Sequence, residues 1–435
     1  MNTESLKGTI HDDLTGLVGI SAFRDKAAEI LRSDTMPWKG TSVIIYLNIE
    51  NFKLFNSKYG FEKGNELLQN FSNLVQEVFF DRLAARFAED NFYVFAEREY
   101  VEEKVDRIAD ELRLMGRGMT LELCGGIYEI TEKNTDVIRA CDMAKIAGDS
   151  IKKKYGINWR FFDEELDEQF SLSQYIVENI DNAIEAGHIK VYYQPVVRTI
   201  NDDICDLEAL ARWDDPVHGL LSPKIFINVL EEYHLIHKLD AFIVQKVCLH
   251  YKHCMQRGNP IIPVSVNLSR MDFELCDIFQ VINQSVYENK VPKNMIHIEV
   301  KESVLSQNEE YMKEQINRFH REGYQVWLDN FGSSNSSLKV LKEFDIDVLK
   351  IDMKFLSDFS EKSRSVLVSV VHMVKSLGIQ TLAEEVETKE QLDFLRSIGC
   401  EKVQGYHYSR PMFYWDLVRH ISERGLFVES PGDRK

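Results

Sequence analysis

Seven polar residues stand where short apolar segments of the sequence end, and together they have the chemistry of a cation site. They are Glu208, Asn267, Glu299, Asp329, Lys350, Glu384 and Gln404. A carboxylate at the end of a buried strand is costly unless something pairs with it, and clustered carboxylates repel one another. A divalent cation relieves that repulsion, and oxygen ligands that include a carboxamide favour Mg²⁺, Mn²⁺ or Ca²⁺ over zinc.

Two basic residues extend this interpretation. Lys350 could neutralise the acids, hold a water or contact a phosphate, although an ordinary structural ion pair also explains one lysine. Arg212, two residues after Leu210, could make a bidentate contact to a phosphate oxygen. A salt bridge or a helix cap is the usual explanation of any single acid, but four or more at one edge indicate metal-assisted hydrolysis of a phosphate ester.

The spacing of the seven residues predicts the fold that carries them. The intervals between them are 59, 32, 30, 21, 34 and 20 positions. Intervals of 20–35 suit repeated β-loop-α units, and the longest has room for one extra unit. The pattern predicts a parallel, TIM-barrel-like (β/α)8 fold with its site at the carboxyl ends of the strands. An open doubly wound sheet is the alternative, but no G-x-G-x-x-G follows its first strand.

The first 160 or so residues follow a different, α+β pattern. Strands are predicted over 41–52 and 121–130, helices over 65–79 and 135–147, and a hairpin over 84–97. The acidic, then amphipathic segment 161–187 contains no Pro and predicts a helical connector. We therefore expect two domains, 1–165 and 166–435.

Composition excludes several classes of protein. The chain has 435 residues, a formal charge of −18, 44% hydrophobic residues and no long basic run, which disfavours disorder and binding of polymeric nucleic acid. The N-terminus lacks an apolar signal segment, and no stretch approaches 18 uncharged apolar residues, so we expect no membrane span. Seven scattered cysteines without C-x-x-C indicate reduced thiols in a cytoplasmic protein.

The same residues carry a resemblance that covers nearly the whole chain. The motifs are YYQPVV, LEALARW, VSVNLS, IEVKES, LDNFGSSNSSL, LKID, AEEVET and VQGYHYSRP, and in the N-terminal part HDDLTGL, NIENFKLFNSKYGFEKGNELL and RFAEDNF. The first eight resemble the EAL domain of bacterial cyclic di-GMP signalling, and the last three resemble its partner, the GGDEF domain. The chain is therefore similar to tandem GGDEF–EAL proteins.

The resemblance implies an activity and a metal requirement. Active EAL domains hydrolyse cyclic di-GMP to linear pGpG with two Mg²⁺ or Mn²⁺ ions, and Ca²⁺ is expected to inhibit. By motif match, the ligands of the first ion would be Glu208, Asn267, Glu299 and Asp329. Asp329 would bridge to the second ion, which Asn330 and Glu384 or Glu387 would help to hold.

Other matched residues would act on the substrate or on the loops. Lys350 matches the lysine that positions or deprotonates the attacking water, beside the acids Glu208, Asp329 and Glu384. Glu302 matches the glutamate that steadies the loop after the paired aspartates. Gln194, Arg212 and Gln404 match residues that lie near or face the ligand.

The EAL-like part departs from the family at two positions that bear on the metal site. Asn330 replaces the second aspartate of the family's DDFG, so the second ion should bind more weakly. Glu385 stands where AEGVE has a glycine that serves a positive φ or a close approach. The loop GSSNSS also differs from the family's version.

The GGDEF-like part departs further. Its motif is Ala88-Glu89-Asp90-Asn91-Phe92, which lacks both glycines and the acidic fourth residue. Asn48 and Glu50 replace the family's metal-binding D-x-D, and further replacements are Ser57, Phe61 and Asn65. We expect no diguanylate cyclase activity, and the domain could instead regulate, dimerise or dock a protein partner.

Three functions remain open from the sequence. The first is a cyclic di-GMP phosphodiesterase slowed by Asn330, and the second is a receptor that holds cyclic di-GMP without cleaving it. The third is a protein–protein regulator that binds no nucleotide. The acid cluster counts against it, because a pure scaffold has no physical need for clustered acids that are costly to bury. The family further implies a homodimer through the EAL domain.

Overall fold

The computed structural model describes residues 11–33, 40–132, 135–306, 308–332, 337–353, 360–424 and 427–429. The chain forms two compact units, 1–172 and 173–435. They divide within helix α6 (Glu164–Glu185), the predicted helical connector, whose N-terminal end carries the predicted boundary at residue 165.

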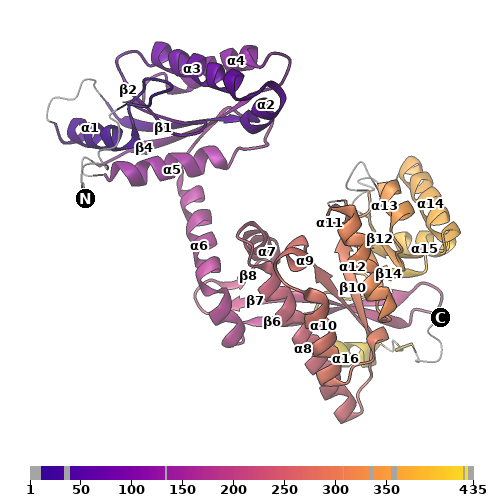
Figure 1. Ribbon diagram of the computed structural model, residues 1–435. Helices are drawn as coiled ribbons and strands as arrows, with labels where there is room; N and C mark the ends of the chain where they lie inside the picture. The colour runs from indigo at the N-terminus through magenta and orange to yellow at the C-terminus, as the bar shows by residue number, and fades with distance from the viewer. Residues whose placement is uncertain are drawn as a thin grey trace, which may run out of the picture. The chain divides into compact units, whose positions relative to one another are not determined.

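The N-terminal unit is a five-stranded sheet with helices on both faces (Figure 1). The strand order is β2-β3-β1-β4-β5, and only β4 and β5 pair in parallel. The strands are β1 (Ser42–Glu50), β2 (Leu83–Ala88), β3 (Asn91–Glu97), β4 (Glu122–Ile130) and β5 (Trp159–Phe161). The helices are α1 (Ile20–Arg32), α2 (Phe52–Tyr59), α3 (Phe61–Val78), α4 (Val101–Met115) and α5 (Val137–Asp149).

Strand β1 is apolar from Val43 to Leu47 because it is covered on both faces. Val43, Ile45 and Leu47 belong to one apolar cluster, which also contains residues of α3 and α4. Ile44 and Tyr46 belong to the cluster on the other face, with residues of α1 and α5. Side chains alternate across a strand, so an uninterrupted apolar run is typical of a central strand between two helical layers.

The predicted hairpin is present, and its turn is strained. Strands β2 and β3 pair antiparallel up to Ala88 and Asn91. Glu89 has φ +44°, which is costly for a residue with a Cβ. The Arg86 guanidinium donates to the Glu89 carbonyl at 2.7 Å, which supports the turn.

The C-terminal unit is a closed barrel with one additional strand. The sheet order is β6-β14-β13-β12-β11-β10-β9-β7-β8, and β6 also pairs with β7, which closes eight strands into a ring. The strands are β6 (Ile189–Arg198), β7 (Ile204–Asp215), β8 (Gly219–Leu221), β9 (Val264–Leu268), β10 (Ile296–Lys301), β11 (Gln325–Asp329), β12 (Val348–Asp352), β13 (Gln380–Glu384) and β14 (Lys402–Gln404). The predicted TIM-barrel-like fold is confirmed.

Two details of the barrel differ from the expectation. Strand β6 runs antiparallel to both neighbours, β7 and β14, so the barrel is not wholly parallel. The long interval before Asn267 holds no further barrel strand. It holds β8, which pairs antiparallel with β7, and the helices α7 (Pro223–Glu232) and α8 (Ile236–Arg257). Apolar patterning does not encode strand direction, so the sequence could not distinguish these arrangements.

Helices follow most of the strands and cover the barrel (Figure 1). They are α9 (Arg270–Leu275), α10 (Ile278–Asn289), α11 (Glu302–Leu305), α12 (Glu309–Arg321), α13 (Ser337–Glu343), α14 (Glu361–Ser376), α15 (Lys389–Ser397) and α16 (Tyr414–Arg424), with a 3₁₀ turn at Lys293–Met295. Capping boxes begin α9 at Ser269 and α15 at Thr388, so these two loops leave the barrel end in a defined geometry.

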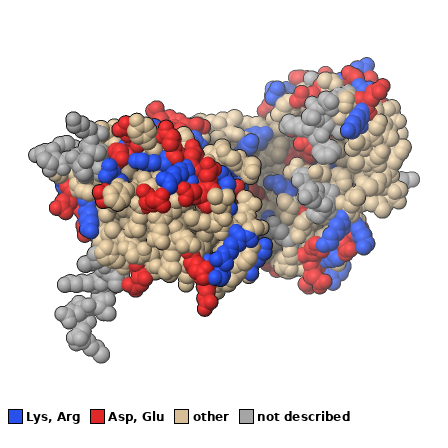
Figure 2. Space-filling model, turned by 90° about the horizontal axis from the view of Figure 1, so that it is seen from above, with Lys and Arg blue, Asp and Glu red and all other residues tan. Residues whose placement is uncertain are grey.

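Charges of both signs are interspersed on the face shown in Figure 2. Many of the surface charges form ion pairs, such as that of Arg107 with Glu77 and Glu111. Within the described residues, no helix is both long and apolar enough to span a bilayer.

The strained turn leads to a stability prediction. Replacing Glu89 by Gly should raise the melting temperature of the N-terminal unit, because Gly adopts positive φ without the cost of a Cβ, a gain of about 1 kcal/mol. Calorimetry of the full chain measures it. Asp90→Gly, at a neighbouring position without positive φ, should lower the same transition. If both substitutions destabilise equally, the turn is not strained.

Candidate active site at the carboxyl ends of the barrel strands

The structure brings most of the predicted site residues together inside one end of the barrel. Each comes from a different strand: Gln194 from β6, Glu208 from β7, Asn267 from β9, Glu299 from β10, Asp329 from β11, Lys350 from β12, Glu384 from β13 and Gln404 from β14. In β9 to β14 these residues lie at the middle of the strand or in its carboxyl-terminal half, at the end of the barrel where enzymes of this fold carry their active sites, whereas β7 continues beyond Glu208 to Asp215 and pairs there with β8.

Lys350 is the centre of the cluster. Its side chain is fully buried, and its ammonium forms ion pairs with Glu299, with Glu384 Oε1 at 2.9 Å and with Glu208 Oε2 at 3.4 Å. Asp329 acts on the lysine electrostatically as a fourth acid. Although burial opposes its charge, the acids raise the pKa of Lys350 well above its usual value, so the lysine stays protonated.

Two carboxamides hold the carboxylate of Glu208, and a third is bonded to one of them. Asn267 Nδ2 donates to Glu208 Oε1 at 3.0 Å, and Gln404 Nε2 donates to Glu208 Oε2 at 2.7 Å. Gln404 also donates to Gln194 Oε1 at 3.2 Å, and Gln194 donates to the backbone carbonyl of Ser409 at 3.2 Å. This chain of bonds fixes the orientation of Glu208 and leaves the amide oxygen of Asn267 as an acceptor.

The acids outnumber the single ammonium of Lys350, and the pKa values of two of them are raised as a result. Burial raises the pKa of Glu384 to about 8, with Asp329 and Glu208 adding repulsion against the attraction of Lys350. Burial and the neighbouring acids raise the pKa of Glu299 well above its usual value. Burial also opposes the charge of Glu208, but Lys350 and the amide donors hold its pKa below the usual value. As it stands, the cluster retains protons.

The carboxylate and amide oxygens of the cluster are of the kind that divalent cations bind. Glu299 Oε2 and Gln404 Oε1 are buried and have no hydrogen-bond partner among the described residues, which costs free energy unless a ligand satisfies them. Within the described residues, no three His, Cys, Asp or Glu side chains are arranged to hold an ion. The acids converge on Lys350 instead, so ion binding requires carboxylates to turn away from the ammonium.

Two carboxylates hold the segment after Asp329 by accepting its backbone N–H groups. Asn330 adopts φ +57°, and its N–H donates to Asp329 Oδ1 at 2.7 Å. Glu302, fully buried at the start of α11, accepts the N–H of Gly332 at 3.1 Å. This contact is of the kind that the resemblance implied for Glu302. Residues 333–336 of the altered loop lie outside the described residues.

The segment after Glu384 separates the two acids that were considered for the second ion. Glu384 contacts Lys350, whereas Glu387 is exposed and its backbone N–H donates to Gln391 Oε1 at 2.9 Å, within the capping arrangement of α15. Glu385 has φ +56°, the conformation that a glycine would adopt without strain. Arg212 is half-buried, donates to the carbonyl of Ala211 and lies 5.6 Å from the ring centre of Tyr192.

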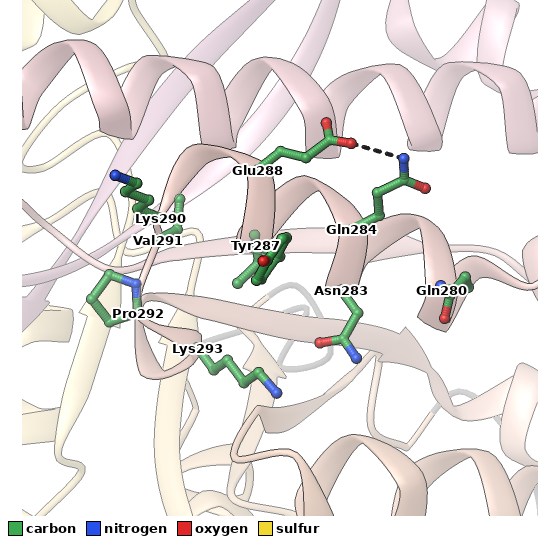
Figure 3. Close-up of a pocket in the computed structure, with 10 residues that line it drawn as sticks. Gln280, Asn283, Gln284, Tyr287, Glu288, Lys290, Val291, Pro292 and Lys293 are labelled. Atoms are coloured by element: carbon green, nitrogen blue, oxygen red, sulfur yellow. Dashed lines mark hydrogen bonds between the residues drawn. The ribbon is translucent and has the colours of Figure 1, made fainter.

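A cavity of about 250 Å³ adjoins the cluster. Glu208 and Asn267 line it from the strands, with Glu231, Asp240 and Lys301 among the charged residues around it. A larger concavity, about 880 Å³, lies along α10 and the following turn, where Tyr287 is exposed and Gln284 donates to Glu288 (Figure 3). Its lining comes wholly from residues 280–293, so it is separate from the acid cluster.

In the N-terminal unit, the polar side chains that match GGDEF site positions are engaged in hydrogen bonds within the chain. Asn48 Nδ2 donates to Asn91 Oδ1 at 3.0 Å, and the Tyr46 hydroxyl donates to the same oxygen at 2.8 Å. Glu50 accepts the backbone N–H of Lys153 at 3.1 Å. Asn48 and Asn91 thus bind each other at two positions where the resemblance implies acids in the GGDEF domain.

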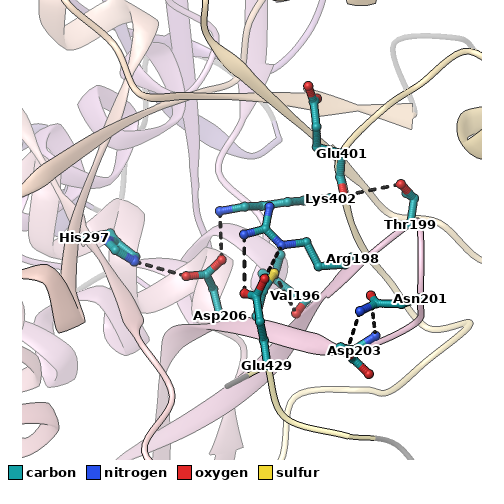
Figure 4. A network of polar contacts seen from close by, with 11 residues as sticks. Val196, Arg198, Thr199, Asn201, Asp203, Asp206, His297, Glu401, Lys402 and Glu429 are labelled. Atoms are coloured by element: carbon teal, nitrogen blue, oxygen red, sulfur yellow. Dashed lines mark hydrogen bonds and ion pairs between the residues drawn. The ribbon is translucent and has the colours of Figure 1, made fainter. Parts of the chain in front are cut away.

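Three buried residues inside the barrel were missed from the sequence: Asp206, His297 and Lys402. Asp206 forms an ion pair with Lys402 and a hydrogen bond with His297 (Figure 4). A signal was present, because each stands two positions before a predicted site residue, in D-L-E, H-I-E and K-V-Q. Alternation places positions i and i+2 on the same face of a strand.

Fold and site together define a TIM-barrel-like protein with an acid-rich site at the end of the barrel where enzymes of this architecture act. Residues 177–411 match the EAL domain model, and residues 9–155 match the model described as diguanylate cyclase, GGDEF domain. The chain therefore belongs to the EAL family, in the tandem GGDEF–EAL arrangement.

Two curated relatives align over most of the chain. The Escherichia coli protein named cyclic di-GMP phosphodiesterase PdeR is 30% identical over 416 residues, 92% of this chain and 61% of its own length. The Pseudomonas aeruginosa protein named cyclic di-GMP phosphodiesterase NbdA is 27% identical over 412 residues, 92% of this chain and 52% of its own. The chain thus spans between half and two thirds of these relatives.

Solved structures show the same fold. A PaMucR phosphodiesterase in complex with cyclic di-GMP is 26% identical, with a TM-score of 0.53 over 56% of this chain and 99% of its own. A Vibrio cholerae LapD S helix-GGDEF-EAL structure bound to cyclic di-GMP has a TM-score of 0.58 over 91% of this chain and 95% of its own, at 18% identity.

The raised pKa of Glu384 predicts how stability depends on pH without metal. Between about pH 4.5 and 8 the native state holds a proton that the unfolded chain has released, so the free energy of unfolding should fall as pH rises. The slope would be at most about 1.4 kcal/mol per pH unit for one proton. Calorimetry in a chelator, followed through the C-terminal transition, measures this slope.

The controls separate Glu384 from its surroundings. Glu384→Gln should reduce the slope, and Mn²⁺ should reduce it in the unaltered protein because a cation replaces the proton. Glu387→Gln, at the exposed position three residues on, should leave the slope unchanged. An equal effect of the two substitutions would show that the proton is not held at Glu384.

Proposed function

We propose that this chain is a cyclic di-GMP phosphodiesterase that yields linear pGpG and requires two Mg²⁺ or Mn²⁺ ions. The observation that carries the proposal is the convergence of Glu208, Glu299 and Glu384 on the buried Lys350. Relatives named for this activity and the family membership support the choice of substrate.

Each residue of the cluster has a role in this proposal. Glu208, Asn267, Glu299 and Asp329 would hold the first ion, and Asp329, Asn330 and Glu384 the second. The ions would supply positive charge to the phosphodiester and make water a better nucleophile. Gln404 and Asn267 orient the Glu208 carboxylate through hydrogen bonds from their side-chain amides, so its oxygens would need little reorganisation to bind an ion.

Lys350 would change partners when cations bind. Its ammonium compensates three glutamates before binding, and cations would take over those carboxylates. The lysine then has N–H groups free to hold a water or a phosphate oxygen. Arg212 has a half-buried guanidinium with donors beyond its bond to Ala211, which suits a contact to a phosphate.

The N-terminal unit would regulate rather than synthesise the nucleotide. The Asn48–Asn91 bond and the side chains of Ala88 and Glu89 occupy places where the family keeps acids and glycines. A dimer contact or a protein partner would act through this domain. In this proposal it has no diguanylate cyclase activity.

One observation favours a receptor without turnover as the second candidate. Asn330 supplies no charge, and its backbone N–H occupies an oxygen of Asp329, the acid that would bridge the two ions. Weaker binding of the second ion would leave cyclic di-GMP bound and uncleaved. Ligand binding and turnover must therefore be measured separately.

The first test is hydrolysis of cyclic di-GMP with Mn²⁺ or Mg²⁺, followed by chromatography of pGpG. Glu208→Gln should reduce turnover at least about 100-fold, because it removes the charge of a metal ligand while keeping its shape. Asp214→Asn, at an exposed position of the same strand, should leave turnover unchanged.

The outcomes distinguish the two candidates. Turnover that Glu208→Gln abolishes would establish the phosphodiesterase. Cyclic di-GMP that binds in Mn²⁺ and Mg²⁺, is recovered intact and binds equally well in Ca²⁺ would show the receptor instead. Absence of binding in all three metals would contradict both.

The second test concerns Asn330. Asn330→Asp should raise turnover several-fold and tighten the second Mn²⁺ about 10- to 100-fold, because it restores one ligand charge. Calorimetric titration with Mn²⁺ and the dependence of turnover on Mn²⁺ measure both effects. Asn51→Asp makes the same charge change at another positive-φ asparagine, in the N-terminal unit, and should have no effect. An unchanged second affinity in Asn330→Asp would shift the cause to the loop or to Glu385.

A further inference from the structure

A layer of three buried polar side chains lies directly beneath the candidate site. Asp206 accepts from Lys402 Nζ at 2.8 Å and contacts His297 Nε2 at 3.1 Å, and all three side chains are buried inside the barrel (Figure 4). The His297 ring stacks on Trp327 with centroids 4.9 Å apart, and Lys402 Nζ lies 4.7 Å from the centre of the same ring.

The register relates this layer to the site residue by residue. Asp206 precedes Glu208 by two positions on β7, His297 precedes Glu299 on β10, and Lys402 precedes Gln404 on β14. Positions i and i+2 of a strand lie on the same face. Trp327, whose ring contacts both His297 and Lys402, likewise precedes Asp329 by two positions on β11.

Asp206, His297 and Lys402 connect strands that the backbone does not pair. Strand β9 separates β7 from β10, and β6 separates β7 from β14. One carboxylate therefore connects three strands whose next inward residues are Glu208, Glu299 and Gln404. Two of these, Glu208 and Gln404, are hydrogen-bonded, and Glu208 and Glu299 share Lys350.

Stability does not require this arrangement. Val196, Cys205, Trp327, Val348 and Leu382 form an apolar cluster beside these three residues, and Ser265, two positions before Asn267 on β9, adds one small buried hydroxyl. A buried ion pair is often no more stabilising than apolar side chains of similar volume, and buried charges are better attested as devices that fix one arrangement.

We propose that Asp206, His297 and Lys402 are positioning residues that hold the ends of β7, β10 and β14 in the register the candidate metal site needs. The inference rests on the proposed function for its catalytic readout only. The layer acts through Glu208, Glu299 and Gln404 and touches neither substrate nor cations.

The test replaces the charges by apolar volume in the full-length protein. Asp206→Leu, His297→Leu and Lys402→Met are combined, and three quantities are measured: the melting temperature in a chelator, the affinity for Mn²⁺ alone, and kcat and KM for cyclic di-GMP. We expect a melting temperature equal to or above that of the parent, Mn²⁺ affinity at least tenfold weaker, and kcat at least tenfold lower with KM changed less than threefold.

A second variant and a control keep the test decisive. Asp206→Asn with Lys402→Gln removes charge but keeps hydrogen bonds between β7 and β14, and should recover Mn²⁺ affinity to within threefold of the parent. Glu429→Gln breaks the ion pair of Arg198 with Glu429, which is also largely buried and joins β6 to the C-terminal segment. It should leave Mn²⁺ affinity and kcat unchanged.

The results separate this inference from the proposed function. Mn²⁺ affinity and kcat within twofold of the parent in the apolar variant would overturn the positioning role. So would a hydrogen-bonded variant as impaired as the apolar one, because the charge itself would then be responsible. A parent without turnover would count against the phosphodiesterase alone, since Mn²⁺ affinity still compares the variants.

Discussion

The C-terminal unit depends on one lysine among acids that cannot otherwise lie together. Lys350 is fully buried and supplies the positive charge in contact with Glu208, Glu299 and Glu384. Carboxylates in a low-dielectric interior repel strongly, and a shared ammonium or retained protons are what allow the strands to close around them. In the proposed function, divalent cations would complete a neutralisation that one lysine leaves unfinished.

The sequence predicted the barrel and the strand-end residues because both depend on local pattern. A short apolar run that ends in an acid, repeated at intervals of 20–35 residues, leaves few other folds. The antiparallel direction of β6 and the hairpin strand β8 depend on which neighbours pair, and hydrophobic pattern does not record that. Asp206 and His297 were missed because a single charge inside an apolar strand resembles an interruption. Such a residue can be interpreted only when the same spacing, two positions before a site acid, recurs on a second strand.

The two units show how fold and site separate. The N-terminal unit keeps apolar residues on both faces of β1 and the hairpin, which suffice to build the sheet. Polar side chains of this unit bind one another, as in the bond of Asn48 to Asn91. These side chains contribute little apolar area, so the core does not depend on them. The C-terminal unit instead buries charges that core packing does not require, since apolar side chains of similar volume are often no less stabilising.

Backbone strain supports the same distinction. Two residues with a Cβ adopt positive φ directly after a site acid: Asn330 follows Asp329, and Glu385 follows Glu384. Asparagine enters this conformation readily, whereas for glutamate it costs about 1 kcal/mol or more. A chain under selection for stability alone would relieve such strain with glycine. Glu385 retains it beside an acid whose pKa is already raised to about 8, so the end of β13 stores strain and charge repulsion together. Ligands that draw Glu384 into coordination would relieve the repulsion, and the rim is therefore better suited to an occupied state than to an empty one.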